Sequence, residues 1–168
     1  MIRAKFYFIF SVIFLLATIC NAQSNLKTTQ KDFRKLSGSW QGSLTYLDYS
    51  TGKPYTMPAD IEISHIAKTN KFAFSNIYPK EASANSIDTI TISTDGKYID
   101  KELVKSRRKL ANGNIQIVSE ELGKDDNKQA TIRHIYIFGK TFFSNIKDVQ
   151  FIGETEWIRR HEYSYTKK

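Results

Sequence analysis

The sequence predicts an all-β fold, a single antiparallel up-and-down barrel of about 8–10 strands preceded by a short N-terminal helical turn. Apolar and polar residues alternate with a period of two through most of the chain. Short clusters of turn-forming residues separate these runs, and helical periodicity is almost absent after residue 36. Strands joined in series by short turns form a meander, and closing a meander into a barrel removes its exposed edges.

The elements follow from local patterns. Phe33 and Leu36 share one face of the helical turn at i, i+3 spacing. Alternation marks each strand, as where Ile132, His134 and Tyr136 fall on one face. The expected elements are, in order, a helical turn at 30–36 and strands at 40–46, 57–65, 72–78, 89–93, 98–107, 115–121, 130–138, 142–149 and 157–166.

The connections carry turn signals of their own. Asp95 and Gly96 predict a tight hairpin, because glycine tolerates a positive φ. Asp48 opens a turn-like stretch, since aspartate bonds nearby backbone N–H groups, and we interpret it as structural. Residues 123–127 (GKDDN) are expected to form a loop.

Two other β architectures fit less well. A sandwich needs longer Greek-key crossings than the short connections here allow. A membrane-spanning barrel needs a continuous outward apolar band. The strand expected at 98–107 alternates basic residues with Asp100 and Glu102, so neither of its faces resembles a lipid-facing surface.

The first 22 residues are expected to be a secretory signal peptide. Arg3 and Lys5 form a basic start, residues 6–19 are apolar, and small Ala22 suits signal peptidase. The apolar run is shorter than the roughly 20 residues that a spanning helix needs. We therefore expect export to the periplasm or the extracellular space, with residues 23–168 forming the barrel domain.

Two alternatives stay open for this N-terminal segment. It is either retained as an anchor, or Cys20 carries a lipid as in bacterial lipoproteins, although bulky Ile19 fits that cleavage site poorly. Cleavage after Ala22 removes the only cysteine of the sequence, which excludes disulfides and cysteine chemistry from the mature chain.

The chain is basic, with 25 Lys and Arg residues against 17 acidic residues and a formal charge of +8. Its one dense basic run is 105–109 (KSRRK), which we interpret as a solvated loop. No basic motif interleaved with aromatic residues predicts nucleic-acid binding. Electrostatic attraction to an anion of the cell envelope is the alternative.

Gly38, Ser39 and Trp40, at the head of the first strand, resemble the Gly-x-Trp motif of the lipocalin and calycin superfamily. The resemblance spans residues 31–166 and implies an up-and-down barrel with Gly38 and Trp40 in structural roles. It also implies that a late arginine packs on the tryptophan, and Arg159 and Arg160 occupy that place. The Thr-Asp-Tyr motif of typical lipocalins is absent.

A barrel of about eight strands has room for side chains or for one small ligand. We expect this protein to be a monomer that holds a hydrophobic or amphipathic molecule inside the barrel, with no cofactor and at most transient membrane contact. Tyr46, Phe74, His134 and Tyr136 are the candidate ligand-binding residues, although the same side chains also suit a dry core.

Two other functions stay open at this point. One is a small isomerase or hydrolase with His134 or His161 as base, and the other is protein binding through the loops. No Gly-x-Ser-x-Gly motif is present. The three histidines, with His65 the first, lie in separate regions, so the sequence predicts no metal site and leaves catalysis unassigned.

Overall fold

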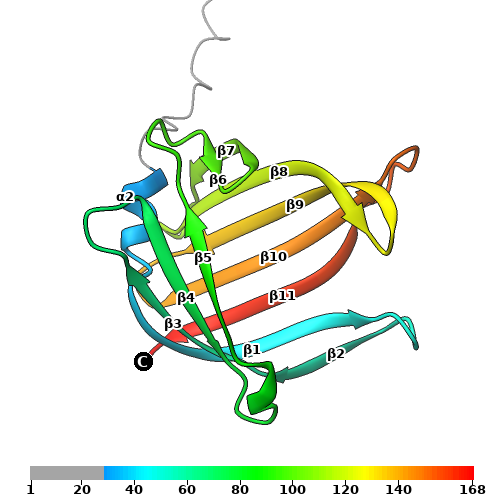
Figure 1. Ribbon diagram of the computed structural model, residues 1–168, viewed down its shortest axis with the longest axis horizontal. Coiled ribbons are helices and arrows are strands. Elements are labelled where there is room, and N and C mark those ends of the chain that lie inside the picture. Colours follow the sequence, from blue (N-terminus) through cyan, green and yellow to red (C-terminus); the bar gives the residue numbers. More distant parts are fainter. Residues whose placement is uncertain (1–28) are drawn as a thin grey trace, which may run out of the picture.

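One antiparallel sheet curls into a nearly closed barrel in the computed structural model, which describes residues 29–168 (Figure 1). The predicted all-β barrel is confirmed. The elements are α2 (Thr29–Arg34), β1 (Gly38–Asp48), β2 (Lys53–Pro58), β3 (Asp60–His65), β4 (Lys71–Ile77), η2 (Ala82–Ala84), β5 (Ser86–Thr91), β6 (Tyr98–Ile99), β7 (Glu102–Lys109), β8 (Ile115–Asp125), β9 (Lys128–Phe138), β10 (Phe142–Phe151) and β11 (Ile158–Lys167). The expected signal peptide at 1–22, with Cys20, lies outside the described residues.

The strand order is β5-β4-β3-β1-β11-β10-β9-β8-β7-β6, and β2 pairs with β1 beside this path. The first and last strands of the chain are therefore neighbours, as barrel closure requires. The remaining junction, between the β5 and β6 ends of the sheet, is short. A single bridge joins Ile92 to Ile99, and Asp100 N–H donates to Thr91 O at 2.7 Å.

Three sequence expectations about the strands need correction. The strand expected at 98–107 is divided into β6 and β7, because Asp100 adopts a φ of 53° and reverses the chain between them, so that β6 pairs with the first residues of β7. The loop expected at 123–127 is mostly strand, since Asp126 and Asn127 alone turn the chain, both with positive φ. The strand expected at 57–65 is interrupted at Ala59, although its register against β1 continues unchanged through β2 and β3.

Helix α2 closes one end of the barrel (Figure 1). Phe33 and Leu36 are fully buried, and the Phe33 ring lies 5.8 Å from Phe72 and 5.4 Å from Tyr136, centroid to centroid. The neighbouring Asp32 is also buried, and its carboxylate accepts two hydrogen bonds from Arg107 on β7. An apolar face and an ion pair thus hold this short helix in place.

Trp40 belongs to the core at the same end, with 1% exposure. Its Nε1 donates to Leu36 O at 2.7 Å, and the Lys167 ammonium lies 4.3 Å from its ring centroid. The expected contact with Arg159 or Arg160 is therefore wrong. The register of β1 against β11 places Lys167, at the end of β11, opposite Trp40, whereas both arginines lie near the start of β11.

Two glycines allow the close approach of β1 to β11. Gly38 has a φ of +119°, and a Cβ there would lie 2.7 Å from Lys167 Nζ. A Cβ on Gly42 would lie within 2.0 Å of Ser164 O. Glycine is therefore required at both positions, which supports the structural role expected for Gly38.

Candidate functional site

The barrel interior changes character along its axis. Near α2 the inward side chains Phe138, Phe143 and Tyr165 are buried to within 2% exposure. Farther from α2, on the same inward faces of β9, β10 and β11, most of the side chains are polar and half-buried. The interior wall, as we call it, consists of His134, Asn145, Lys147, His161 and Tyr163, with buried Tyr136 at its base. One half of the interior is filled, and the other retains solvent access.

Aromatic rings run continuously along this wall. Tyr163 stacks on Tyr165 at 5.8 Å between centroids, and the His161 ring lies 5.3 Å from Tyr163. His134 continues the series, 6.4 Å from His161 and 6.2 Å from Tyr136. The rings give the wall a large apolar area with polar edges.

Glu102 is the acidic group of the wall. The turn at Asp100 brings its carboxylate inward, where it bonds His134 Nδ1 at 2.6 Å and accepts a hydrogen bond from the Ser119 hydroxyl. In nucleophilic catalysis the hydroxyl must bond the histidine that accepts its proton. Here both groups bond the same carboxylate, so this arrangement does not activate Ser119.

His161 is a half-buried histidine of the wall. Burial lowers the pKa of His161 from 6.5 to about 4, and the positive charges of His134 and Lys147 act in the same direction. Its imidazole is therefore neutral at pH 7 and offers one hydrogen-bond donor and one acceptor. Neither ring nitrogen forms a hydrogen bond with any described residue.

Asn145 lies between Tyr136 and Tyr163 in the ladder of β9, β10 and β11. Its side-chain oxygen is buried and has no hydrogen-bond partner among residues 29–168. The hydroxyl of Tyr136 forms no hydrogen bond with a described residue either. Burial, followed by the charge of Glu102, raises the pKa of Tyr136 well above its ordinary value, so this hydroxyl keeps its proton and can donate.

An ionic cluster lies farther from α2. Asp125 is carried at the tip of the β8–β9 hairpin, which curls toward the ends of β10 and β11 (Figure 1). Its carboxylate bonds Lys147 at 3.0 Å, Arg160 at 2.7 Å and the Tyr49 hydroxyl at 3.3 Å. Burial alone would raise the pKa of Asp125, but Lys147 and Arg160 outweigh it and hold that pKa below its ordinary value.

The structure gathers only part of the predicted ligand-binding set. His134 and Tyr136 lie side by side on the wall, and Tyr46 is opposite His161 in the register of β1 and β11. Phe74 lies in the filled half, where it is 5% exposed and contacts Phe143. Among the residues that the sequence did not single out, Glu102 had a usable signal, because it shares a strand face with apolar Val104.

The histidines do not form a metal site together. His65 lies away from the other two and bonds Thr69 O at 2.8 Å, whereas His134 and His161 are neighbours. The described residues include no group of three or more His, Cys, Asp or Glu side chains suited to a metal ion. None of the described helices is long and apolar enough to cross a membrane.

The lowered pKa of His161 predicts a specific loss of stability in mild acid. Between about pH 6.5 and pH 4 the unfolded chain takes up a proton that the folded protein excludes, so stability falls as pH drops through this window. The loss from this one group is up to about 3 kcal/mol. We expect His161→Phe to flatten the pH dependence measured by urea unfolding, and Gln41→Leu, a substitution of an exposed residue that does not titrate, to keep the original slope. An equal slope in both variants would contradict the assignment.

No protein-family model and no curated protein matches this chain in sequence. Among solved structures it is similar to the crystal structure of Rv2717c from M. tuberculosis. The two chains share 11% identity with a TM-score of 0.50, over 83% of this chain and 97% of the other. At this identity the similarity extends to the fold alone.

Proposed function

We propose that this protein is an exported carrier that holds one small amphipathic molecule against the interior wall of the barrel. The observation that supports this most directly is Asn145, whose buried side-chain oxygen lacks a partner within the described chain. An unpaired buried acceptor costs about 1–3 kcal/mol, and proteins almost always satisfy such groups. A ligand that donates a hydrogen bond here removes that cost.

Neighbouring groups define the polar end of such a ligand. The neutral His161 imidazole offers a donor and an acceptor, and the Tyr136 hydroxyl offers a donor. Glu102 and His134 are already joined to one another, as are Tyr78 and Tyr163 through their hydroxyls at 2.8 Å. The free groups therefore suit an uncharged polar function that can donate a hydrogen bond to Asn145, such as a hydroxyl or a primary amide, better than a strong anion.

The rest of the ligand would contact the aromatic rings. Tyr163 and His161 present ring faces and edges along the wall, and Tyr46 lies beside them on β1. Apolar walls with a few polar anchors are typical of small-molecule sites. Solvent access to half-buried His161 and Tyr163 argues against a completely dry core at this end.

Export of the carrier is part of the same proposal. The basic start, apolar run and small Ala22 within residues 1–22 support export, because they are typical of a signal peptide. A hydrolase is disfavoured because Ser119 donates to Glu102 and not to a histidine.

Native mass spectrometry of protein purified from its own host, with organic extraction of any bound molecule, tests the carrier function. A thermal-shift screen of fatty acids, sterols, quinones and haem follows. A true ligand at a hundredfold excess over its dissociation constant raises stability by about 2.7 kcal/mol. Failure to recover a bound molecule, together with no shift in the screen, would contradict the proposal.

Asn145→Leu separates a binding role from a structural one. Removing the unpaired acceptor should raise the stability of the empty protein by about 1 kcal/mol and weaken the ligand-induced shift. Gln41→Leu makes the same kind of change at an exposed position on β1 and should alter neither quantity. A less stable empty Asn145→Leu variant with an unchanged ligand shift would show that Asn145 is structural only.

A further inference from the structure

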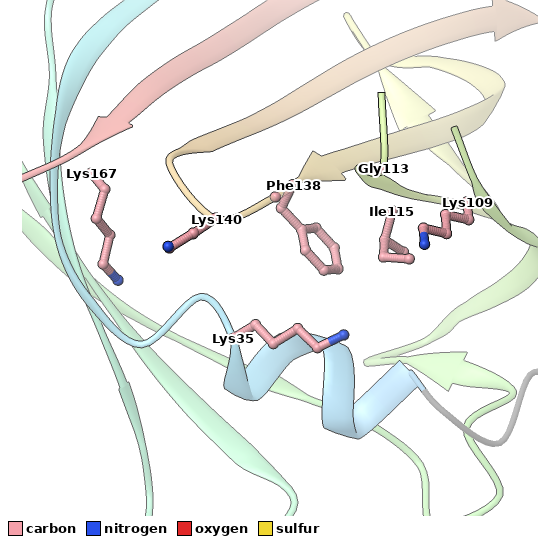
Figure 2. Close-up of a pocket in the computed structure, with 8 residues that line it drawn as sticks. Lys35, Lys109, Gly113, Ile115, Phe138, Lys140 and Lys167 are labelled. Atoms are coloured by element: carbon pink, nitrogen blue, oxygen red, sulfur yellow. The ribbon is translucent and has the colours of Figure 1, made fainter. Parts of the chain in front are cut away.

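A hollow lies at the end of the barrel that α2 closes, between this helix and the nearby ends of β7 to β11 (Figure 2). Its volume is about 620 Å³. Four lysines line it: Lys35, Lys109, Lys140 and Lys167. No acidic side chain is among its lining residues. The hollow, which we call the lysine pocket, is therefore strongly positive.

Two of these lysines already have partners inside the protein. Lys35 Nζ lies 3.1 Å from Asp32, and Lys167 Nζ donates to Ser37 O at 2.5 Å. Lys109 and Lys140 are exposed and form no hydrogen bond or ion pair with a described residue. Figure 2 shows the Lys140 ammonium directed toward that of Lys167. Bringing these cations together costs energy unless an anion lies among them.

All the cations of the basic run at 105–109 except Lys109 have partners among the described residues. Lys105 pairs with Glu120, Arg107 with Asp32, and Arg108 Nε donates to Gln116 at 2.6 Å. Lys109 is the one cation of the run without a partner in the described part of the chain, and it is the one that lines the pocket. The loop expected at 105–109 is therefore the second half of β7, and its cations other than Lys109 bond side chains of other elements.

The pocket also has an apolar side. Phe138 and Ile115 line it between the lysines (Figure 2), and because Phe138 is only 1% exposed, half-buried Ile115 supplies most of the accessible apolar surface. This surface suits the first carbons of a chain attached to an anionic group. A pocket for a simple inorganic ion needs no such wall.

We propose that the lysine pocket binds a phosphate-bearing amphiphile, with the phosphate at Lys140 and Lys167, whose ammonium groups face each other, and its carbon chain along Ile115 toward Lys109 (Figure 2). Lysine ammonium groups bind phosphate through charge-assisted hydrogen bonds, and Lys35 and Lys109 add to the positive potential of the pocket. This site is separate from the interior wall, and the proposal does not rest on the carrier function. Both a free phosphate ester and a lipid headgroup in a membrane carry the required chemistry.

Calorimetric titration of the processed chain with dodecyl phosphate and with inorganic phosphate, and co-sedimentation with phosphatidylcholine vesicles with or without phosphatidylglycerol, test the proposal. Lys109→Gln/Lys140→Gln should weaken binding about tenfold or more. Lys53→Gln/Lys80→Gln removes the same charge from exposed positions at the opposite end of the barrel and should leave binding within about twofold. Asn145→Leu should leave it unchanged, which separates this site from the interior wall.

The two sources give different results. Tight binding of dodecyl phosphate without vesicle association identifies a soluble ligand, and association that requires phosphatidylglycerol identifies a membrane lipid. Either result supports the site when the binding is lost in Lys109→Gln/Lys140→Gln and kept in the control Lys53→Gln/Lys80→Gln. Absence of binding in every arm, or equal losses in the pocket and control variants, would overturn the proposal and indicate no more than general attraction to a basic protein.

Discussion

Phe33→Ala is expected to lower the free energy of unfolding by about 3–5 kcal/mol. The Phe33 side chain is fully buried and lies against the rings of Phe72, Tyr136 and Phe138. Its removal leaves a cavity at the end that α2 closes, where a six-residue helix has little stability of its own. Urea unfolding followed by the fluorescence of the nearby Trp40 measures the loss.

The matched control for this substitution is Leu122→Ala on β8, where the side chain is 77% exposed. We expect a change of about 0.5 kcal/mol or less there. A loss below about 1 kcal/mol in Phe33→Ala would show that α2 does not contribute to the core as described.

Asp125→Ala is expected to cost about 3–5 kcal/mol, because it leaves two cations without their counter-charge. The Arg160 side chain is 8% exposed and that of Lys147 is 23% exposed, so neither charge is fully hydrated in the fold. The lowered pKa of Asp125 gives the same contribution a pH dependence. It is present above the ordinary aspartate pKa of about 3.9 and is lost as pH falls below that value.

Thermal and urea unfolding at neutral pH measure the cost of Asp125→Ala. Glu162→Ala is the control, since it removes a carboxylate that pairs at 2.9 Å with Arg159, whose side chain is 52% exposed. Surface pairs of this kind contribute about 0–1 kcal/mol. Equal effects in the two variants would mean that the Asp125 cluster is as hydrated as a surface pair.

Local patterns in the sequence were enough to predict the barrel. Alternation at 130–138 places His134 and Tyr136 on one face in any sheet, because neighbouring residues of a strand point to opposite sides. The turn at Asp95 and Gly96 was equally local, and Gly96 has the positive φ that it required. By contrast, the pairing of β1 with β11 joins the two ends of the domain, and no local signal predicts its register.

That register explains the largest error at the predicted structural site. A late cation does lie on Trp40, but it is Lys167, seven residues beyond Arg160. Arg160 instead lies 4.7 Å from the Tyr49 ring and binds Asp125, a residue expected in a loop. The free oxygen of Asn145 is beyond sequence reasoning for a related reason, since it depends on which partners three separate strands bring close.

The short junction between β5 and β6 has a mechanical consequence. Long ladders join β8, β9, β10 and β11, whereas the junction between β5 and β6 has a single bridge, between Ile92 and Ile99, and a few hydrogen bonds beside it. The barrel sheet can therefore open at this junction while the pairing of its other strands stays intact. Opening this junction disrupts fewer hydrogen bonds than separating β9 from β10, so we expect amide protons beside the junction to exchange with solvent faster than those of β9 and β10.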